Sequence, residues 1–250
     1  MTPEENRLPE AERVLHMWEP LPYSVEAGYD YLRPRWHQRL GTGIFRGVVT
    51  LILAAYLRLA FGFRVKGREN LRALGAGGAV AVCNHVHPMD CTMVDRALLG
   101  RRVYYLTLDS NFRIPVVRHI IRWLGAVPVS RSPEQIRAMF AAMESGLSGG
   151  AVVQVYPEGV LIPYHRELGS FRNGAFRMAV DSRVPVLPMV IRQQPPEGLY
   201  RLYKRKPCLH LEILPPVYPD LSLPRREAVA TLNRTCRAQM EARLLSEKEE

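Results

Sequence analysis

A histidine and a carboxylate stand close together where a strand is expected to end and a helix to begin. His85 follows the apolar run Ala79–Cys83, which is short, rich in valine and alanine, and typical of a buried strand. Asp90 lies after Pro88, about one turn into the helical pattern Met89–Leu99. A carboxylate that binds one imidazole nitrogen leaves the other nitrogen free to take a proton. The pair therefore suits a general base, although a loop histidine beside a helix-start carboxylate has the same pattern.

Two further stretches carry charged side chains at the ends of expected strands. Gly125–Arg131 closes a short strand with an arginine, and Tyr156–Gly159 follows a buried strand with a glutamate. Sites in parallel sheets form at the carboxyl ends of the strands. We therefore expect His85, Arg131 and Glu158 to lie close together.

Taken together, these stretches resemble the motif blocks of the glycerolipid acyltransferase family, which 1-acyl-glycerol-3-phosphate acyltransferase typifies. One block alone is a weak signal, whereas four in the family's order and at its usual spacing are a strong one. The resemblance covers about residues 43–215. Its four blocks are, in order, Asn84–Asp90, Gly125–Arg131, Tyr156–Gly159 and Val184–Pro188. The shorter segment that follows the third block is Phe171–Ala175.

The resemblance implies an O-acyltransferase of phospholipid biosynthesis. A fatty acyl group would move from acyl-CoA or acyl-carrier protein to a hydroxyl of a lysophospholipid-like acceptor, 1-acylglycerol-3-phosphate or a related lipid. His85 would act as the base and Asp90 would orient it. Arg131 would hold a phosphate, and Glu158 would bond the acceptor or brace its loop. No metal and no cofactor besides the acyl donor is implied.

The same resemblance bears on the oxyanion and on the nucleophile. The tetrahedral intermediate needs hydrogen-bond donors, and the backbone N–H groups of Gly159, at the substrate-binding turn, and of Val160 are candidates. Cys83 and Cys91 are the nearby nucleophiles, and Cys83 falls within the expected buried strand. We therefore expect direct transfer to the acceptor, without an acyl-enzyme.

The third block departs from the family pattern. It usually reads Phe-Pro-Glu-Gly-Thr-Arg-Ser, but here Gly159 is followed by Val160-Leu161-Ile162. In the family, the missing arginine is associated with the acceptor's phosphate. The sequence therefore leaves open whether lysophosphatidic acid is the acceptor. Arg166 and Arg172 are the candidates to replace it.

Three other functions compete with acyl transfer. The altered third block is compatible with a non-catalytic lipid-binding member of the same fold. A metal-dependent hydrolase using His85, His87 and Asp90 is a further alternative, but the spacing is one residue too long and Cys91 replaces the last histidine of the His-x-His-x-Asp-His pattern. The net charge of +10 also suits nucleic acid, yet it is spread along the chain without a recognised module, so we expect no nucleic-acid partner.

The elements that position these residues alternate between strand and helix. At 250 residues, the chain is long enough for one large α/β domain. We predict a mixed, mostly parallel sheet flanked by helices and an N-terminal apolar, membrane-associating helix. The predicted divisions are a polar and aromatic lead-in at 1–42, the apolar helix at 43–63 and the acyltransferase domain at 64–250.

The apolar helix is the most hydrophobic segment of the chain. Its charge-free part, between Arg46 and Arg58, is well short of the ~20 residues that span a bilayer. It is either a buried core helix or, as we predict, a helix that lies on or partly in a membrane surface, flanked by arginines. The aromatic lead-in suits a membrane interface or an arm over the domain. The cysteine pattern predicts reduced thiols and no secretory signal is recognisable, so we expect the cytoplasmic face of a membrane, with peripheral or monotopic attachment.

Overall fold

A seven-stranded mixed sheet forms the centre of the described part of the molecule. The computed structural model describes residues 28–32, 36–108, 112, 121–122, 124–130 and 132–246. The strands run in the order β1-β7-β6-β2-β5-β3-β4, and every neighbouring pair is parallel except β6 and β7. This confirms the predicted mixed, mostly parallel sheet. Their bounds are β1 (Arg64–Lys66), β2 (Ala79–Cys83), β3 (Val103–Leu108), β4 (Ala126–Val129), β5 (Val152–Val155), β6 (Val186–Gln194) and β7 (Cys208–Ile213).

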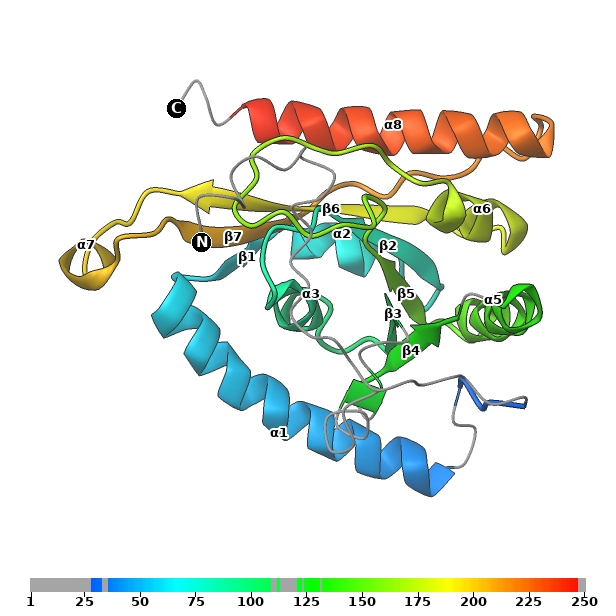
Figure 1. The fold of residues 1–250 in the computed structure, drawn as a ribbon, viewed down its shortest axis with the longest axis horizontal. Helices are drawn as coiled ribbons and strands as arrows, with labels where there is room; N and C mark the ends of the chain where they lie inside the picture. The colour runs from blue at the N-terminus through cyan, green and yellow to red at the C-terminus, as the bar shows by residue number, and fades with distance from the viewer. Residues whose placement is uncertain are drawn as a thin grey trace, which may run out of the picture.

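Helices cover both faces of the sheet (Figure 1). Side chains of β2 alternate between two hydrophobic clusters: Val80 and Val82 face the helices α5, α6 and α8, whereas Ala81 and Cys83 face α1, α2 and α3. A strand that is buried on both faces needs a continuous apolar sequence, which explains why this run was recognisable. The helices are α1 (Trp36–Phe61), α2 (Arg68–Ala73), α3 (Asp90–Ala97), α5 (Pro133–Ser148), α6 (Gly174–Asp181), α7 (Tyr200–Tyr203) and α8 (Arg225–Leu245).

Helix α1 is longer than the apolar pattern predicted. It begins at Trp36 rather than at residue 43, because a helix propagates through polar residues that hydrophobicity does not mark. Leu57 is fully buried against the domain, whereas Leu51 is 72% and Ile52 is 66% exposed. In the part of the chain that the structure describes, no helix combines the length and the apolar character needed to cross a membrane.

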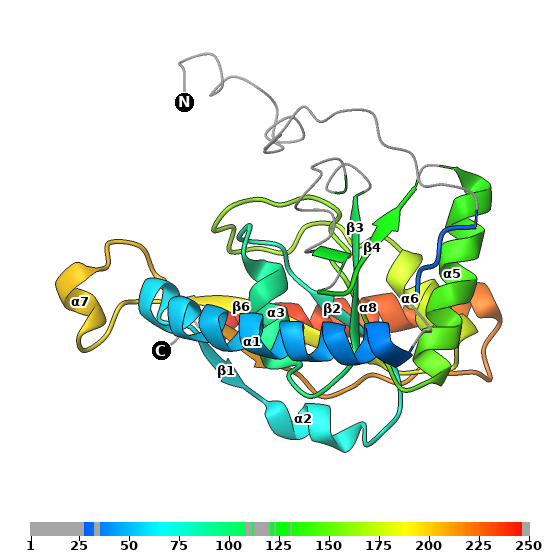
Figure 2. The same ribbon diagram turned by 90° about the horizontal axis from the view of Figure 1, so that it is seen from below.

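The last turn of α1 is held by α7, the short helix in the connection between β6 and β7. The hydroxyls of Tyr200 and Tyr203 donate to the carbonyl oxygens of Arg58 and Leu59 at 2.8 and 2.9 Å, and Lys204 Nζ donates to that of Ala60. The last carbonyls of a helix have no partner within it, so Tyr203 and Lys204 satisfy those of Leu59 and Ala60. The carbonyl of Arg58 accepts both the Tyr200 hydroxyl and the N–H of Gly62, at 3.1 Å. Figures 1 and 2 show α7 beside the C-terminal end of α1.

Residues 28–32 of the predicted lead-in lie against the domain. Tyr31 donates its hydroxyl to the Gln135 carbonyl at 3.3 Å, and Tyr104 donates to the Leu32 carbonyl at 3.3 Å. The Arg122 guanidinium lies 4.5 Å from the ring centroid of Tyr29. Residues 28–32 therefore form part of an arm over the domain. Residues 36–42 of the predicted lead-in belong to α1, and residues 1–27 and 33–35 lie outside the described residues.

Two of the motif blocks build the sheet. Gly125, which opens the second block, has a φ of +100°, and a Cβ there would lie 2.3 Å from the Val103 carbonyl oxygen, so only glycine lets this turn approach β3. In the fourth block, Val186 pairs with Val80 and Pro188 pairs with Val82 of β2. The second block thus forms β4, and the fourth block forms the start of β6, which pairs with the strand that leads to His85, β2.

His210 on β7 should make stability depend on pH. Burial, together with repulsion from Arg64, Lys66 and Arg192, lowers the pKa of His210 to about 4. Unfolded histidine has a pKa of about 6.5, so as the pH falls the unfolded chain takes up the proton first and is favoured. The stability from neutral His210 is present above about pH 6.5 and is lost as the pH falls toward about 4. Between about pH 7 and about pH 5, we expect His210 to lower the free energy of unfolding by about 1 kcal/mol, after allowance for solvent screening.

Urea unfolding of the wild type and of His210→Gln at these two pH values measures the effect. The variant should lack this part of the pH dependence. Equal dependence in both proteins would contradict the assignment.

Candidate active site

The predicted pair of His85 and Asp90 is formed. His85 Nδ1 lies 3.0 Å from Asp90 Oδ2, and the same oxygen accepts the backbone N–H groups of Val86 at 2.7 Å and His87 at 2.9 Å. Asp90 is fully buried and is the first residue of α3, so the expectation that it lies one turn into the helix was wrong. The reason is local: the chain before Asp90 folds around its carboxylate instead of continuing the helix.

This arrangement fixes the proton of the imidazole. Ionised Asp90 can only accept, so Nδ1 of His85 is the donor and Nε2 is left as an acceptor. The side chain of His85 is 24% exposed, whereas that of Asp90 is 0% exposed. The site therefore combines a buried carboxylate with a partly accessible imidazole nitrogen, which is the geometry of a general base.

Tyr156 supports the face of the imidazole. Its ring stacks on that of His85 with the centroids 4.1 Å apart and the planes 15° apart. Burial raises the pKa of Tyr156 well above its ordinary value, so its phenol stays protonated. Sequence reasoning counted Tyr156 only as the start of the third block and missed this contact. The family's third block also begins with an aromatic residue, phenylalanine, and this shared aromatic position could have indicated a ring contact with His85.

Glu158 braces two backbone segments. Its Oε1 accepts the N–H of His85 at 3.1 Å, and its Oε2 accepts the N–H of Gly169 at 2.9 Å. Burial raises the pKa of this carboxyl above its ordinary value. Of the two roles that the sequence allowed, this geometry supports the brace, because both oxygens already bind the protein's own backbone.

The loop after β5 also pairs with the histidine loop through its backbone. Ile162 N donates to the His85 carbonyl at 3.2 Å, and Tyr164 N donates to the Val86 carbonyl at 2.9 Å. The N–H of Gly159 donates to the Tyr156 carbonyl at 3.1 Å and so is engaged in the turn. The N–H of Val160 has no hydrogen-bond partner within the described residues. Of the two candidate donors to the oxyanion, the N–H of Gly159 is therefore already hydrogen-bonded, and the N–H of Val160 is the one that can donate.

His87 faces a different part of the molecule from His85. Its ring lies 4.8 Å from that of Phe61 and 5.7 Å from that of Tyr164, and its Nδ1 accepts the N–H of Met89 at 3.1 Å. Burial lowers the pKa of His87, which favours the neutral ring. Among the described residues, no group of three or more His, Cys, Asp or Glu side chains is placed to hold a metal ion.

Neither nearby cysteine is activated as a nucleophile. Burial raises the pKa of the Cys83 thiol well above its ordinary value, and its Sγ lies 3.6 Å from Asn84 Oδ1. Cys91 is an exposed residue of α3, and partial loss of solvation around its thiol, together with the nearby Asp90 carboxylate, raises its pKa to about 11. Because the thiolate is the nucleophilic form, both side chains are unreactive at neutral pH.

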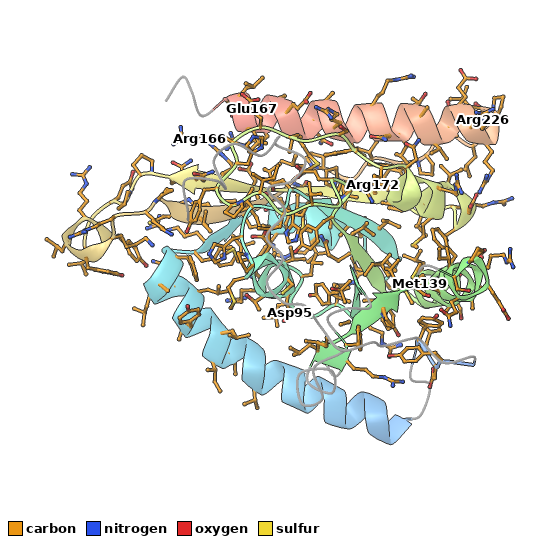
Figure 3. The ribbon with its side chains drawn as sticks, viewed as in Figure 1. Asp95, Met139, Arg166, Glu167, Arg172 and Arg226 are labelled. Atoms are coloured by element: carbon orange, nitrogen blue, oxygen red, sulfur yellow. The ribbon has the colours of Figure 1, made fainter. Side chains whose placement is uncertain are left out.

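The structure separates the two arginines that were candidates for the missing phosphate contact. A Cβ built on Gly159 would lie 2.9 Å from Arg172 Cζ, so the guanidinium of Arg172 covers the third block. Arg166 is exposed in the loop near the C-terminal part of α8 (Figure 3), and no contact ties it to this block. Arg131 lies outside the described residues.

Known proteins match both the sequence and the fold. The family model described as "Acyltransferase" matches residues 62–192. The chloroplastic 1-acyl-sn-glycerol-3-phosphate acyltransferase LPAT1 of Arabidopsis thaliana is 32% identical over 130 residues, which cover 51% of this chain and 35% of that protein. The human 1-acyl-sn-glycerol-3-phosphate acyltransferase alpha is 23% identical over 182 residues, covering 66% of this chain and 59% of its own length.

The fold has a counterpart among solved structures. The 1-acyl-sn-glycerophosphate acyltransferase PlsC of Thermotoga maritima has a TM-score of 0.53 at 22% identity, covering 79% of this chain and 81% of that one. The matched region spans 35% and 36% of the lengths of the two chloroplastic relatives, from Arabidopsis thaliana and Brassica napus. Since the family model covers more than half of the 250 residues, the chain belongs to the acyltransferase family.

Proposed function

We propose that the chain is an O-acyltransferase that moves a fatty acyl group from acyl-CoA or acyl-carrier protein to the hydroxyl of a lysophospholipid-like acceptor. 1-Acylglycerol-3-phosphate is the proposed acceptor, because it is the substrate in the names of the matching relatives. One observation carries the proposal: Asp90 holds Nδ1 of His85 at 3.0 Å and leaves Nε2 as a proton acceptor. Family membership supports the reaction class.

The proposed reaction uses His85 twice. Nε2 takes the proton of the acceptor hydroxyl while the hydroxyl oxygen attacks the thioester carbonyl carbon. The N–H of Val160 donates to the resulting oxyanion. The carbon–sulfur bond then breaks, the carbonyl re-forms as an ester, and the leaving thiolate takes the proton back from the imidazolium. Asp90 stabilises the imidazolium between these steps, and Arg131 remains our candidate for a phosphate contact.

The membrane contact that we propose joins α1 and α7. Apolar side chains of both elements are exposed, including Leu51, Leu59 and Leu202, the last at 81%. The hydrogen bonds between α7 and the last turn of α1 hold the two elements together, and Lys204 lies over the ring of Phe61. Apolar side chains rimmed by cationic ones suit an anionic lipid surface. We propose attachment at the cytoplasmic face, with α1 lying on or partly in the bilayer.

A thioester-consumption assay with a panel of lysolipid and amino-lipid acceptors tests the function. We expect turnover with 1-acylglycerol-3-phosphate and little with amino-lipids. Turnover of none of the acceptors, combined with binding to liposomes, would favour a non-catalytic lipid-binding protein instead.

Arg172 should set the preference for a phosphorylated acceptor. Its guanidinium covers Gly159 in place of the arginine that the third block lacks, and it forms no ion pair with a carboxylate of the described residues. Hydrogen bonds to a charged group are worth about 1.5–3 kcal/mol, or roughly 10–100-fold in affinity. Arg172→Ala should therefore raise KM for 1-acylglycerol-3-phosphate by about that factor.

The matched control is Arg177→Ala, which removes another exposed arginine, on α6. Neither substitution should change KM for an uncharged monoacylglycerol acceptor, if the enzyme accepts one. Equal KM values for 1-acylglycerol-3-phosphate in the wild type and Arg172→Ala would overturn this role.

A further inference from the structure

A pocket away from the histidine loop gathers four arginines. It lies between the C-terminal half of α1, β1, α2 and α3, and its volume is about 610 Å³. Figure 2 shows β1 alongside that half of α1. Its lining shares no residue with the proposed catalytic site. The arginines come from four separate elements: Arg58, Arg64, Arg68 and Arg96.

The positive charges in this pocket are not neutralised by the residues that the structure describes. None of the four arginines forms an ion pair with a described carboxylate. Arg68 donates to the carbonyl oxygen of Arg96 at 2.9 Å, while Nη1 of Arg96 is buried and has no hydrogen-bond partner among the described residues. Burial, with repulsion from Arg96 and Arg72, lowers the pKa of Arg68. Cations brought together against this repulsion, with a buried donor unused, are typical of a site for an anion.

The pocket borders α1 close to exposed apolar side chains of that helix. Ala54 and Arg58, one helical turn apart, line it. Leu51 lies two turns before Arg58, so it is close to the same edge of the helix, and it is exposed together with Leu59. A ligand with an anionic group and an apolar chain would therefore reach both surfaces at once.

We propose that this pocket binds the phosphate of an anionic phospholipid headgroup while the lipid's acyl chains lie along the exposed side of α1. The site would hold α1 at the membrane in one orientation. The proposal rests on the membrane contact proposed for α1 and is independent of the roles of His85 and Asp90. Arg58, at the border of the two surfaces, is the residue that joins the headgroup site to the apolar side.

Binding to lipid vesicles tests the proposal. The full chain is sedimented with vesicles of phosphatidylcholine alone or with a minority of phosphatidylglycerol. We expect the second kind to bind more tightly. Replacing Arg64, Arg68 and Arg96 with glutamine should weaken this binding by about tenfold or more, since each cation near an anionic surface contributes several-fold. Ala54→Phe, which fills the pocket without changing the charge, should weaken it as well.

The control removes three exposed arginines from the opposite side of the sheet, as Arg137→Gln, Arg177→Gln and Arg226→Gln on α5, α6 and α8 (Figure 3 labels Arg226). Non-specific attraction predicts the same loss for both triple variants, and that result would overturn the pocket. If the wild-type chain binds vesicles with and without phosphatidylglycerol equally, both the proposed pocket site and the proposed membrane contact are overturned.

A second measurement identifies the source of the phosphate. If inorganic phosphate raises the melting temperature of the wild type but not of Ala54→Phe, and vesicle binding is equal in the two, the pocket takes a soluble phosphate and the lipid proposal fails. If phosphate has no such effect and vesicle binding differs as expected, the lipid headgroup is the ligand.

Discussion

Replacing His85 with alanine is expected to lower the rate of acyl transfer by about 10²–10⁴-fold, the usual contribution of a positioned base. The fold should survive, because the imidazole is partly exposed and Asp90 Oδ2 keeps its two backbone donors, Val86 and His87. Thioester consumption measured under saturating donor and acceptor gives the rate, and urea unfolding gives the stability.

A neighbouring histidine provides the control. His165 lies in the loop after β5, where its Nδ1 contacts the Glu167 carbonyl oxygen at 2.8 Å, and it makes none of the contacts of the His85–Asp90 pair. His165→Ala should keep at least a large part of the activity. If His85→Ala and the wild type are equally active, the proposed mechanism fails. An acyl group trapped on a cysteine after incubation with donor alone would instead show an acyl-enzyme.

Replacing Asp90 with alanine is expected to lower both activity and stability. The substitution leaves the N–H groups of Val86 and His87 and Nδ1 of His85 without their common acceptor. An unsatisfied buried donor costs about 1–3 kcal/mol, so we expect the free energy of unfolding to fall by a few kcal/mol. Activity should fall by about 10²-fold or more, because His85 loses the group that fixes its proton.

Asp90→Asn separates the catalytic from the structural effect. Its amide oxygen can still accept the two backbone N–H groups, so most of the stability should return. It cannot supply a negative charge to the imidazolium, so activity should stay about as low as in Asp90→Ala. Recovery of activity in step with stability across the two variants would show that Asp90 acts only through the fold.

The parts that could be predicted from sequence are those in which neighbouring residues carry the signal. The apolar run Ala79–Cys83 marks β2, a strand that is buried on both faces. His85 and Asp90 are close in sequence, so a single turn brings them together. The resemblance to known motif blocks added the reaction class, which periodicity alone does not contain.

The parts that escaped prediction depend on contacts between distant segments. Glu158 bridges the N–H groups of His85 and Gly169, and the sequence does not show which backbone groups lack a partner. Arg172 reaches the third block only because the loop after β5 returns to Gly159. The same limit applies to α7, whose four residues are too few for a periodic pattern and whose position is set by bonds to α1.

The bonds between α1 and α7 also have a consequence for biosynthesis. Tyr200 and Tyr203 are separated from the α1 carbonyls that they bond by 142 and 144 residues. A ribosome adds about 5–20 residues per second, so α1 emerges roughly 7–30 s before its last turn gains these partners. β1 likewise cannot pair with β7 until a stretch of chain of similar length has been synthesised. The nascent chain therefore exposes this apolar helix without these partners until α7 and β7 have been synthesised.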